Sequence, residues 1–245
     1  METRAESVDQ IVGWMKRKVQ EAGAVGVVFG LSGGLDSAVV AALAVRAFGK
    51  SALGLIMPCY SEAEDVSHGE LVAQAFKLPY KIIDLGPVYD LLIETMTRAM
   101  PDDGDAAEMA RLNLKPRLRM ATLYYVAACH NCLVLGTGNK SEIMTGYFTK
   151  YGDGGVDLEP IGHLLKSQVK ELAYYLHVPE DIILKAPSAG LAAGQTDEKE
   201  LGLKYAELDH YLQTGQADPA IKERIEYLRK KSEHKRFPPP TPLDA

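Results

Sequence analysis

The sequence predicts an α/β fold in which a doubly wound parallel sheet is flanked by helices and followed by a helical C-terminal part. Short apolar segments alternate with longer periodic segments as far as Leu135, and a glycine-rich loop follows the first apolar segment. Beyond Gly155 the periodic segments are helical. Alternating strands and helices are typical of parallel sheets that carry helices on both faces, and such sheets bind ligands at the carboxyl ends of their strands.

The individual elements follow from local patterns. Apolar residues at helical spacing predict an amphipathic helix over 7–22, and the segment 36–48 is too long for a buried strand, so we expect a buried helix there. Ser61 and Glu64 form a capping-box pattern for a helix that runs to about Phe76. Strands are predicted at residues 25–29, 52–57, 80–85 and 132–135. Further helices are predicted at residues 87–99, 106–131 (with a kink at Pro116), 164–176, 198–212 and 218–231.

Composition limits the class of protein. The 245 residues, 47% of them hydrophobic, are enough for one domain over residues 1–245. The net charge of −6 argues against a broad nucleic-acid interface, and no apolar run is long enough to span a membrane. Three cysteines are too few and too odd in number for a disulfide framework, so we expect a cytoplasmic protein.

The loop between the first strand and the buried helix has the composition of a phosphate site. It consists of Gly30, Leu31, Ser32, Gly33, Gly34, Leu35, Asp36 and Ser37. Glycines at the start of a helix expose backbone N–H groups that converge on one point, and Asp36 is placed to hold a Mg²⁺ ion that bridges phosphate oxygens. A plain strand-to-helix turn is the alternative interpretation. The spacing matches neither the Walker A pattern nor the dinucleotide fingerprint.

The six residues SGGLDS resemble the pyrophosphate-binding loop of the ATP pyrophosphatases, S-G-G-x-D-S. Further segments resemble the NAD synthetase family in order and spacing: NLKPRLRM (113–120), GTGNKSE (136–142), GYFTKYGDGGVDLEPIGHLLKSQV (146–169), KAPSAGL (185–191), TDEKELG (196–202) and EHKR (233–236). The resemblance implies an adenine-nucleotide hydrolase-like fold and a ligase of NAD biosynthesis. Such an enzyme adenylates the nicotinate carboxylate of deamido-NAD⁺ with ATP, releases pyrophosphate, and lets ammonia displace AMP.

The resemblance also implies roles for single residues. As ATP ligands beyond the loop it implies Thr137, Lys166 and Ser188. As ligands of deamido-NAD⁺ it implies Arg117, Lys150, Asp157, His234 and Lys235. Asp36 and Glu142 are expected to hold Mg²⁺, and Lys166 is also a catalytic candidate because a cation near the phosphates neutralises charge as pyrophosphate departs. Without the resemblance, a helix-surface lysine is most simply solvated.

One catalytic candidate comes from the chemistry of ammonia. Ammonium must lose a proton before it attacks the acyl adenylate, and a carboxylate near the reacting carbon would accept that proton. Asp153, between Gly152 and Gly154, is our hypothesis for this group. A turn aspartate between glycines is the alternative.

The family resemblance further implies a homodimer, with the apolar stripe of residues 118–127 in the region of the two-fold interface. That stripe is most simply core. The loop starts at Gly30, so we expect no glutamine amidohydrolase domain ahead of it, and hence free ammonia or ammonia from another protein as the nitrogen donor. The alternatives are another ATP pyrophosphatase that acts on a different acyl or tRNA substrate, or a non-catalytic nucleotide sensor.

Overall fold

A computed structural model describes residues 4–100, 105–187 and 196–242. A four-stranded parallel sheet forms its centre, in the order β3-β2-β1-β4. The strands are β1 (Gly26–Gly30), β2 (Ala52–Ile56), β3 (Tyr80–Ile82) and β4 (Cys132–Leu135). The parallel sheet confirms the predicted fold class, although β3 ends three residues earlier than expected.

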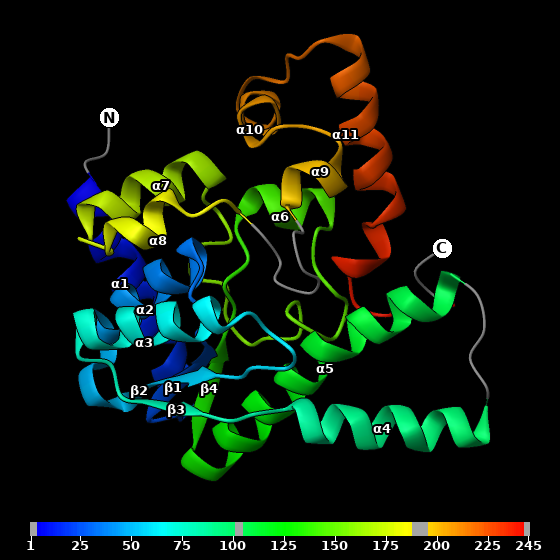
Figure 1. Ribbon diagram of the computed structural model, residues 1–245. Helices are drawn as coiled ribbons and strands as arrows, with labels where there is room; N and C mark the ends of the chain where they lie inside the picture. The colour runs from blue at the N-terminus through cyan, green and yellow to red at the C-terminus, as the bar shows by residue number, and fades with distance from the viewer. Residues whose placement is uncertain (1–3, 101–104, 188–195, 243–245) are drawn as a thin grey trace.

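Helices cover both faces of the sheet (Figure 1). The helices of the first half are α1 (Arg4–Glu21), α2 (Leu35–Phe48), α3 (Ala63–Phe76), α4 (Gly86–Ala99) and α5 (Asp105–His130). Those of the second half are α6 (Lys140–Thr145), α7 (Lys166–Tyr175), α8 (Glu180–Leu184), α9 (Asp197–Leu201), α10 (Tyr205–Thr214) and α11 (Pro219–Lys231). Short 3₁₀ turns occupy Gly49–Ser51 and Glu233–Lys235. Among the described residues, no helix has the length and apolar character needed to cross a bilayer.

The side chains of β1 alternate between two cores, as a strand buried on both faces requires. Val27 and Phe29 pack with α1, α2 and α7, whereas Val28 packs with Leu123 of α5 on the other face. The apolar stripe of α5 therefore belongs largely to the core, as its composition predicted. A third, smaller core joins α9, α10 and α11 around Leu208.

Two predicted features differ from the structure. Ser61 does not cap α3, whose N-cap is Glu62 without a side-chain cap bond, because the Ser61 hydroxyl accepts hydrogen bonds from Cys59 N and Arg119. The helix expected over 198–212 is two helices, α9 and α10, since Gly202 adopts a left-handed conformation (φ 70°). In the first of these differences, the partly buried Arg119 also contacts the end of β2.

The topology places two loops side by side. The chain runs from β1 outward to β2 and β3 on one side, while β4 pairs with the other side of β1, with Phe29 opposite Leu135. The loops that follow β1 and β4 therefore leave the same edge of the sheet at its topological switch point, where ligands of such sheets bind. Figure 1 shows α6, α9, α10 and α11 gathered beyond this edge.

Candidate active site at the carboxyl edge of the sheet

The loop after β1 packs tightly on α3. Gly33 has φ 76°, and a Cβ atom there would lie 2.5 Å from the backbone oxygen of Asp65, so only glycine fits. Gly34 is the N-cap of α2 and has no side-chain cap bond. Its backbone N–H donates to Ser32 Oγ (3.3 Å), and Ser32 and Ser37 are hydrogen-bonded through their hydroxyls (3.0 Å). These contacts fix the loop at the N-terminus of α2, where a helix start without a side-chain cap can bind an anion.

Asp36, Glu142 and Lys166 meet beside this loop. The Lys166 ammonium lies 2.5 Å from Asp36 Oδ2 and 3.1 Å from Glu142 Oε1. Lys166 is the buried first residue of α7, and the two carboxylates come from the first turns of α2 and α6. Three segments distant in the sequence therefore converge on one cationic group. The alternative interpretation of Lys166 as a solvated surface lysine is wrong, because its side chain is buried.

Asn139 fixes the carboxylates relative to each other. Its side-chain amide donates to Asp36 Oδ1 (2.9 Å), and its side-chain oxygen accepts the backbone N–H of Glu142 (3.0 Å). The Glu142 carboxylate in turn accepts the backbone N–H of Asn139, which completes a capping box at the start of α6. The sequence analysis missed this role, although the N-x-x-E spacing within GTGNKSE was a readable signal.

The residues present fit Mg²⁺. Asp36 and Glu142 already turn one oxygen each toward a single cation, and Mg²⁺ in nucleotide sites takes one or two carboxylates together with substrate phosphates. Among the described residues, no cluster of three or more histidine, cysteine or acidic side chains forms a metal cage. The donor set therefore suits an ion that arrives with phosphate oxygens.

The charges of this cluster depend on one another. Burial lowers the pKa of Lys166, but Asp36 and Glu142 raise it by more, so the lysine stays protonated. Burial raises the pKa of Glu142 to about 7, with the nearby Lys166 lowering it and Asp36 raising it. A second cation that replaces or joins the lysine would favour the ionised form of Glu142.

Tyr205 and Asp197 close the cluster from the C-terminal side. The Tyr205 hydroxyl donates to Asp197 Oδ2 (2.9 Å) and lies 3.4 Å from Glu142 Oε1, and its ring lies 5.1 Å from the Lys166 ammonium. Asp197 is buried, and its Oδ1 atom has no hydrogen-bond partner. Neither residue was among the sequence candidates, because only tertiary packing brings α9 and α10 to this edge.

Glu159 supports the loop that follows β4. Its carboxylate accepts the backbone N–H of Gly138 (3.0 Å), and a Cβ atom on Gly136 would lie 2.4 Å from that carboxyl group. Thr137, the predicted ATP ligand, lies half-buried between these two glycines. Burial raises the pKa of Glu159 to about 8, so the group is largely protonated at neutral pH.

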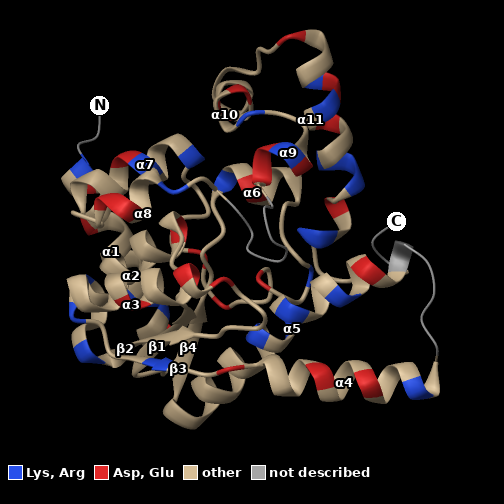
Figure 2. Cartoon of the chain, viewed as in Figure 1, with Lys and Arg blue, Asp and Glu red and all other residues tan. Residues whose placement is uncertain are grey.

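The structure brings together most of the residues expected to bind the second nucleotide. Lys150 Nζ donates to the backbone oxygen of His234 (2.6 Å), and Lys235 Nζ donates to the backbone oxygens of Gly146 and Phe148 (2.8 and 2.6 Å). Arg117 is close enough to lower the pKa of Lys235, after the larger effect of burial. Figure 2 shows these basic segments at the end of α11 and on α5, facing acidic loops beyond the sheet edge.

Two aspartates of the expected set have different surroundings. Asp153 accepts the backbone N–H of Thr149 (2.8 Å), and although part of the residue reaches solvent, the enclosing protein raises the pKa of its carboxyl group. Asp157 accepts hydrogen bonds from the Tyr124 hydroxyl (2.9 Å) and from Val134 N of β4 (2.8 Å). Asp157 is thus held beside α5 rather than by the lysines. Ser188 lies outside the described residues.

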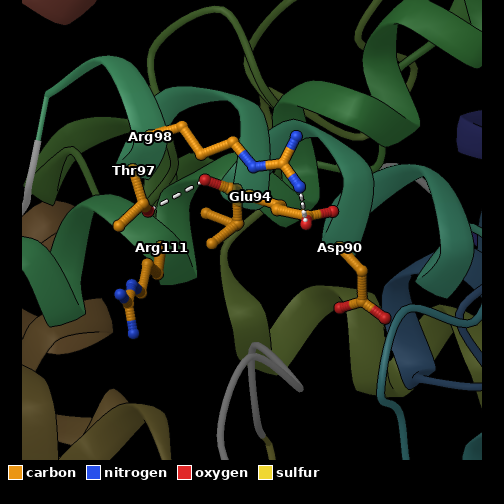
Figure 3. Close-up of a pocket in the computed structure, with 6 residues that line it drawn as sticks. Asp90, Glu94, Thr97, Arg98 and Arg111 are labelled. Carbon is orange, nitrogen blue, oxygen red and sulfur yellow. Dashed lines mark hydrogen bonds and ion pairs between the residues drawn. The ribbon is translucent and has the colours of Figure 1, made fainter.

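Two surface pockets lie apart from this cluster. One, of about 420 Å³, is lined by α4 and α5, with Arg98 paired to Glu94 at 2.5 Å (Figure 3). The other contains Tyr60, whose hydroxyl donates to Asp90, and Ser61.

Arg119, from the same region, donates to the backbone oxygen of Met57 (3.0 Å) and to Ser61 Oγ (3.3 Å). These contacts tie the end of β2 to α5, a role that the sequence did not suggest.

The buried Glu159 predicts a pH-dependent stability. Its ordinary pKa is 4.5 and its pKa in the fold is about 8, so the folded state binds the proton more tightly and the free energy of unfolding falls between these pH values. Glu159→Gln keeps an acceptor for Gly138 and cannot ionise. In urea unfolding, we measure the free energy of unfolding of the variant minus that of the parent. We expect this difference to be larger at pH 9 than at pH 5 by about 1 kcal/mol or more. The exposed Glu223→Gln is the control, and equal differences at both pH values would contradict the assignment.

Comparisons with known proteins show the family of this chain. The family model described as NAD synthase matches residues 7–239. The NH(3)-dependent NAD(+) synthetase of Carboxydothermus hydrogenoformans is 48% identical over 238 residues, 97% of each chain, and that of Methanocaldococcus jannaschii is 46% identical over 98% of each.

Two solved structures superpose closely. The NMN synthetase of Francisella tularensis has a TM-score of 0.93 at 38% identity, over 99% of each chain. The NH3-dependent NAD synthetase of Campylobacter jejuni has a TM-score of 0.82 at 29% identity, over 98% of this chain and 99% of that one. The chain belongs to the NAD synthase family.

Proposed function

We propose that this chain is an ammonia-dependent NAD synthetase, an ATP-dependent ligase that converts deamido-NAD⁺ to NAD⁺. The observation that carries the proposal is the convergence of Asp36, Glu142 and Lys166 beside a glycine-rich loop at the carboxyl edge of the sheet. The family and the names of the relatives above support the same reaction. We also infer a cytoplasmic enzyme, because its cysteines are free thiols.

In the first step, an oxygen of the nicotinate carboxylate attacks the α-phosphorus of ATP, and the bond to pyrophosphate breaks. The loop from Gly30 to Ser37 holds the phosphates with backbone and hydroxyl donors, and Thr137 and Ser188 are the further ATP ligands. Lys166 neutralises charge on the departing pyrophosphate. Asp36 and Glu142 hold Mg²⁺, which supplies additional positive charge to the phosphates when bound.

Binding of the second nucleotide falls to the basic residues near the end of α11. Arg117, Lys150, His234 and Lys235 lie close to one another, and their positive charge suits the negative pyrophosphate and carboxylate of deamido-NAD⁺. Asp157 accepts hydrogen bonds and suits sugar hydroxyls.

In the second step, ammonia attacks the acyl carbon and the bond to AMP breaks. Ammonium must first lose a proton, and Asp153 is the group we assign to accept it. The surrounding protein raises the pKa of the Asp153 carboxyl group, which makes its carboxylate a better proton acceptor than an aspartate with the ordinary pKa. The balance of both steps is one amide, one AMP and one pyrophosphate for each ATP consumed.

A second substrate follows from one comparison. The Francisella protein, which superposes with a TM-score of 0.93, is named an NMN synthetase. Nicotinate mononucleotide carries the same carboxylate as deamido-NAD⁺, so the same two steps would amidate it. The two substrates differ only in the adenylate half, and the assay must therefore include both.

The reaction is tested with purified protein, Mg-ATP, ammonium and either nucleotide. We expect matched production of amide and pyrophosphate, with NAD⁺ formed from deamido-NAD⁺ and nicotinamide mononucleotide formed from nicotinate mononucleotide, and a faster rate for deamido-NAD⁺. Asp36→Asn should lower turnover about hundredfold because it removes a carboxylate that pairs with Lys166 and is proposed to hold Mg²⁺ at the phosphates. The exposed Asp181→Asn on α8 is the control. Faster amidation of the mononucleotide would favour the second substrate, and no pyrophosphate with either would refute the proposal.

The role of Asp153 predicts a separation of the two steps. Asp153→Asn keeps the acceptor for Thr149 N but cannot take a proton. Pyrophosphate release in a single turnover should stay close to that of the parent, while amide formation should fall about hundredfold or more. Rapid-quench measurement of both products decides this. If both rates are unchanged, Asp153 is a turn residue.

We also infer that two copies of the chain associate through α4. Helices α4 and α5 project away from the sheet (Figure 1), and α4 carries large exposed apolar side chains. These include Val88, Leu91, Met96 and, directly after the helix, Met100. Val88 and Leu91 are three residues apart and lie on one face of α4, and exposed apolar side chains gathered on one face can mark an interaction site.

Association through α4 predicts that a charged side chain introduced on this helix prevents the dimer from forming. Leu91→Glu should convert a dimer to a monomer in size-exclusion chromatography with light scattering, because the charge would be desolvated at the interface. Leu184→Glu on α8 is a matched control, since both leucines are 64% exposed. A monomeric parent protein, or a dimer that survives Leu91→Glu, would rule out this interface.

A further inference from the structure

The carboxylate of Asp209 contacts the residues that adjoin Glu142 and Lys166 along the chain. Asp209 belongs to α10 and is only 5% exposed. Its Oδ1 atom accepts the Ser141 hydroxyl (2.5 Å), and its Oδ2 atom accepts the backbone N–H of Ser167 (2.8 Å). Ser141 Oγ in turn accepts the backbone N–H of Lys166 (3.1 Å). One buried carboxylate therefore joins three helices.

These contacts reach the immediate neighbours of the functional candidates. Ser141 precedes Glu142 in the first turn of α6, and Ser167 follows Lys166 in the first turn of α7. The Asp209 charge lies at the N-terminal ends of both helices, where the helix dipole favours an anion. Any displacement of this carboxylate would shift the backbone that carries Glu142 and Lys166.

Helix α10 presents a second side chain to the same cluster. Tyr205 lies four residues before Asp209, so both side chains occupy one face of the helix. Tyr205 contacts the side chains of Glu142 and Asp197. Asp209 instead contacts Ser141 and Ser167, which are the chain neighbours of Glu142 and Lys166. We propose that Asp209 is a positioning residue, which holds Glu142 and Lys166 at the separation that the release of pyrophosphate requires. The inference rests on the proposed function.

The replacement of one atom group tests this role. In Asp209→Asn an NH₂ group replaces one oxygen, so one of the two acceptors is lost and a donor faces a donor. Because a misplacement of about 1 Å costs up to about hundredfold in rate, we expect kcat for pyrophosphate release to fall about tenfold or more. The Michaelis constants for ATP and deamido-NAD⁺ should change by less than about threefold, since the loop after β1 and the basic residues bind the ground state.

The experiment compares five proteins: the parent, Asp209→Asn, Ser141→Ala, the double variant, and Asp218→Asn. Asp218 is the matched control, because its exposed carboxylate also accepts a helix N–H (Ala220 N, 3.2 Å) in the same C-terminal helices. Thermal unfolding shows that each variant is folded. A network that acts as a unit predicts that the double variant is no slower than Asp209→Asn alone.

The possible outcomes distinguish a failure of the proposed function from a failure of the positioning role of Asp209. A parent protein that releases no pyrophosphate refutes the proposed function. If the parent is active, the positioning role is overturned by an unchanged kcat in folded Asp209→Asn, by an equal loss in Asp218→Asn, or by independent effects in the double variant. If Asp209→Asn does not fold, Ser141→Ala decides: a kcat lowered about tenfold with little change in KM supports the role, and an unchanged kcat overturns it.

Discussion

The ammonium of Lys166, held between Asp36 and Glu142, is the interaction on which the rest of the site depends. Burying two carboxylates and one ammonium costs desolvation energy that their attraction barely offsets, so such a cluster contributes little net stability. Removing one member is costly, because it leaves a buried charge without its partner. The cluster therefore constrains geometry: α2, α6 and α7 must begin at points that bring the three groups together.

That constraint explains why the C-terminal helices are part of the site. The sheet and its loops position Asp36 and Glu142, but α7 begins far along the chain and needs a separate anchor. The anchor is α10, which packs on α6 and α7 and has its own apolar core around Leu208. Buried polar contacts between helices need complete hydrogen bonding, and here Ser141 and Ser167 supply donors to α10.

The sequence predicted what local chemistry determines. Strand and helix alternation placed the sheet, and glycines at a helix start marked the loop from Gly30 to Ser37. Tertiary packing decided the rest. Ser61 has the spacing of a helix cap, but Arg119 from a distant helix takes its hydroxyl. Tyr205 lies outside the segments that carry the family resemblance, and Asp197 lies within one of them without an assigned role. Both reach the cluster only because α9 and α10 fold back onto the sheet edge.

The negative charge of the carboxylates beside the loop opposes the binding of ATP, which is also negative. Asp36, Glu142 and Asp197 place carboxyl groups beside the proposed phosphate loop, so their negative charge opposes the binding of a negative triphosphate unless cations intervene. Lys166 compensates for only part of this charge. A divalent ion brought by ATP would supply the remainder and would at the same time favour ionised Glu142, whose pKa burial raises to about 7. In the proposed site, nucleotide, metal and carboxylates would therefore stabilise one another.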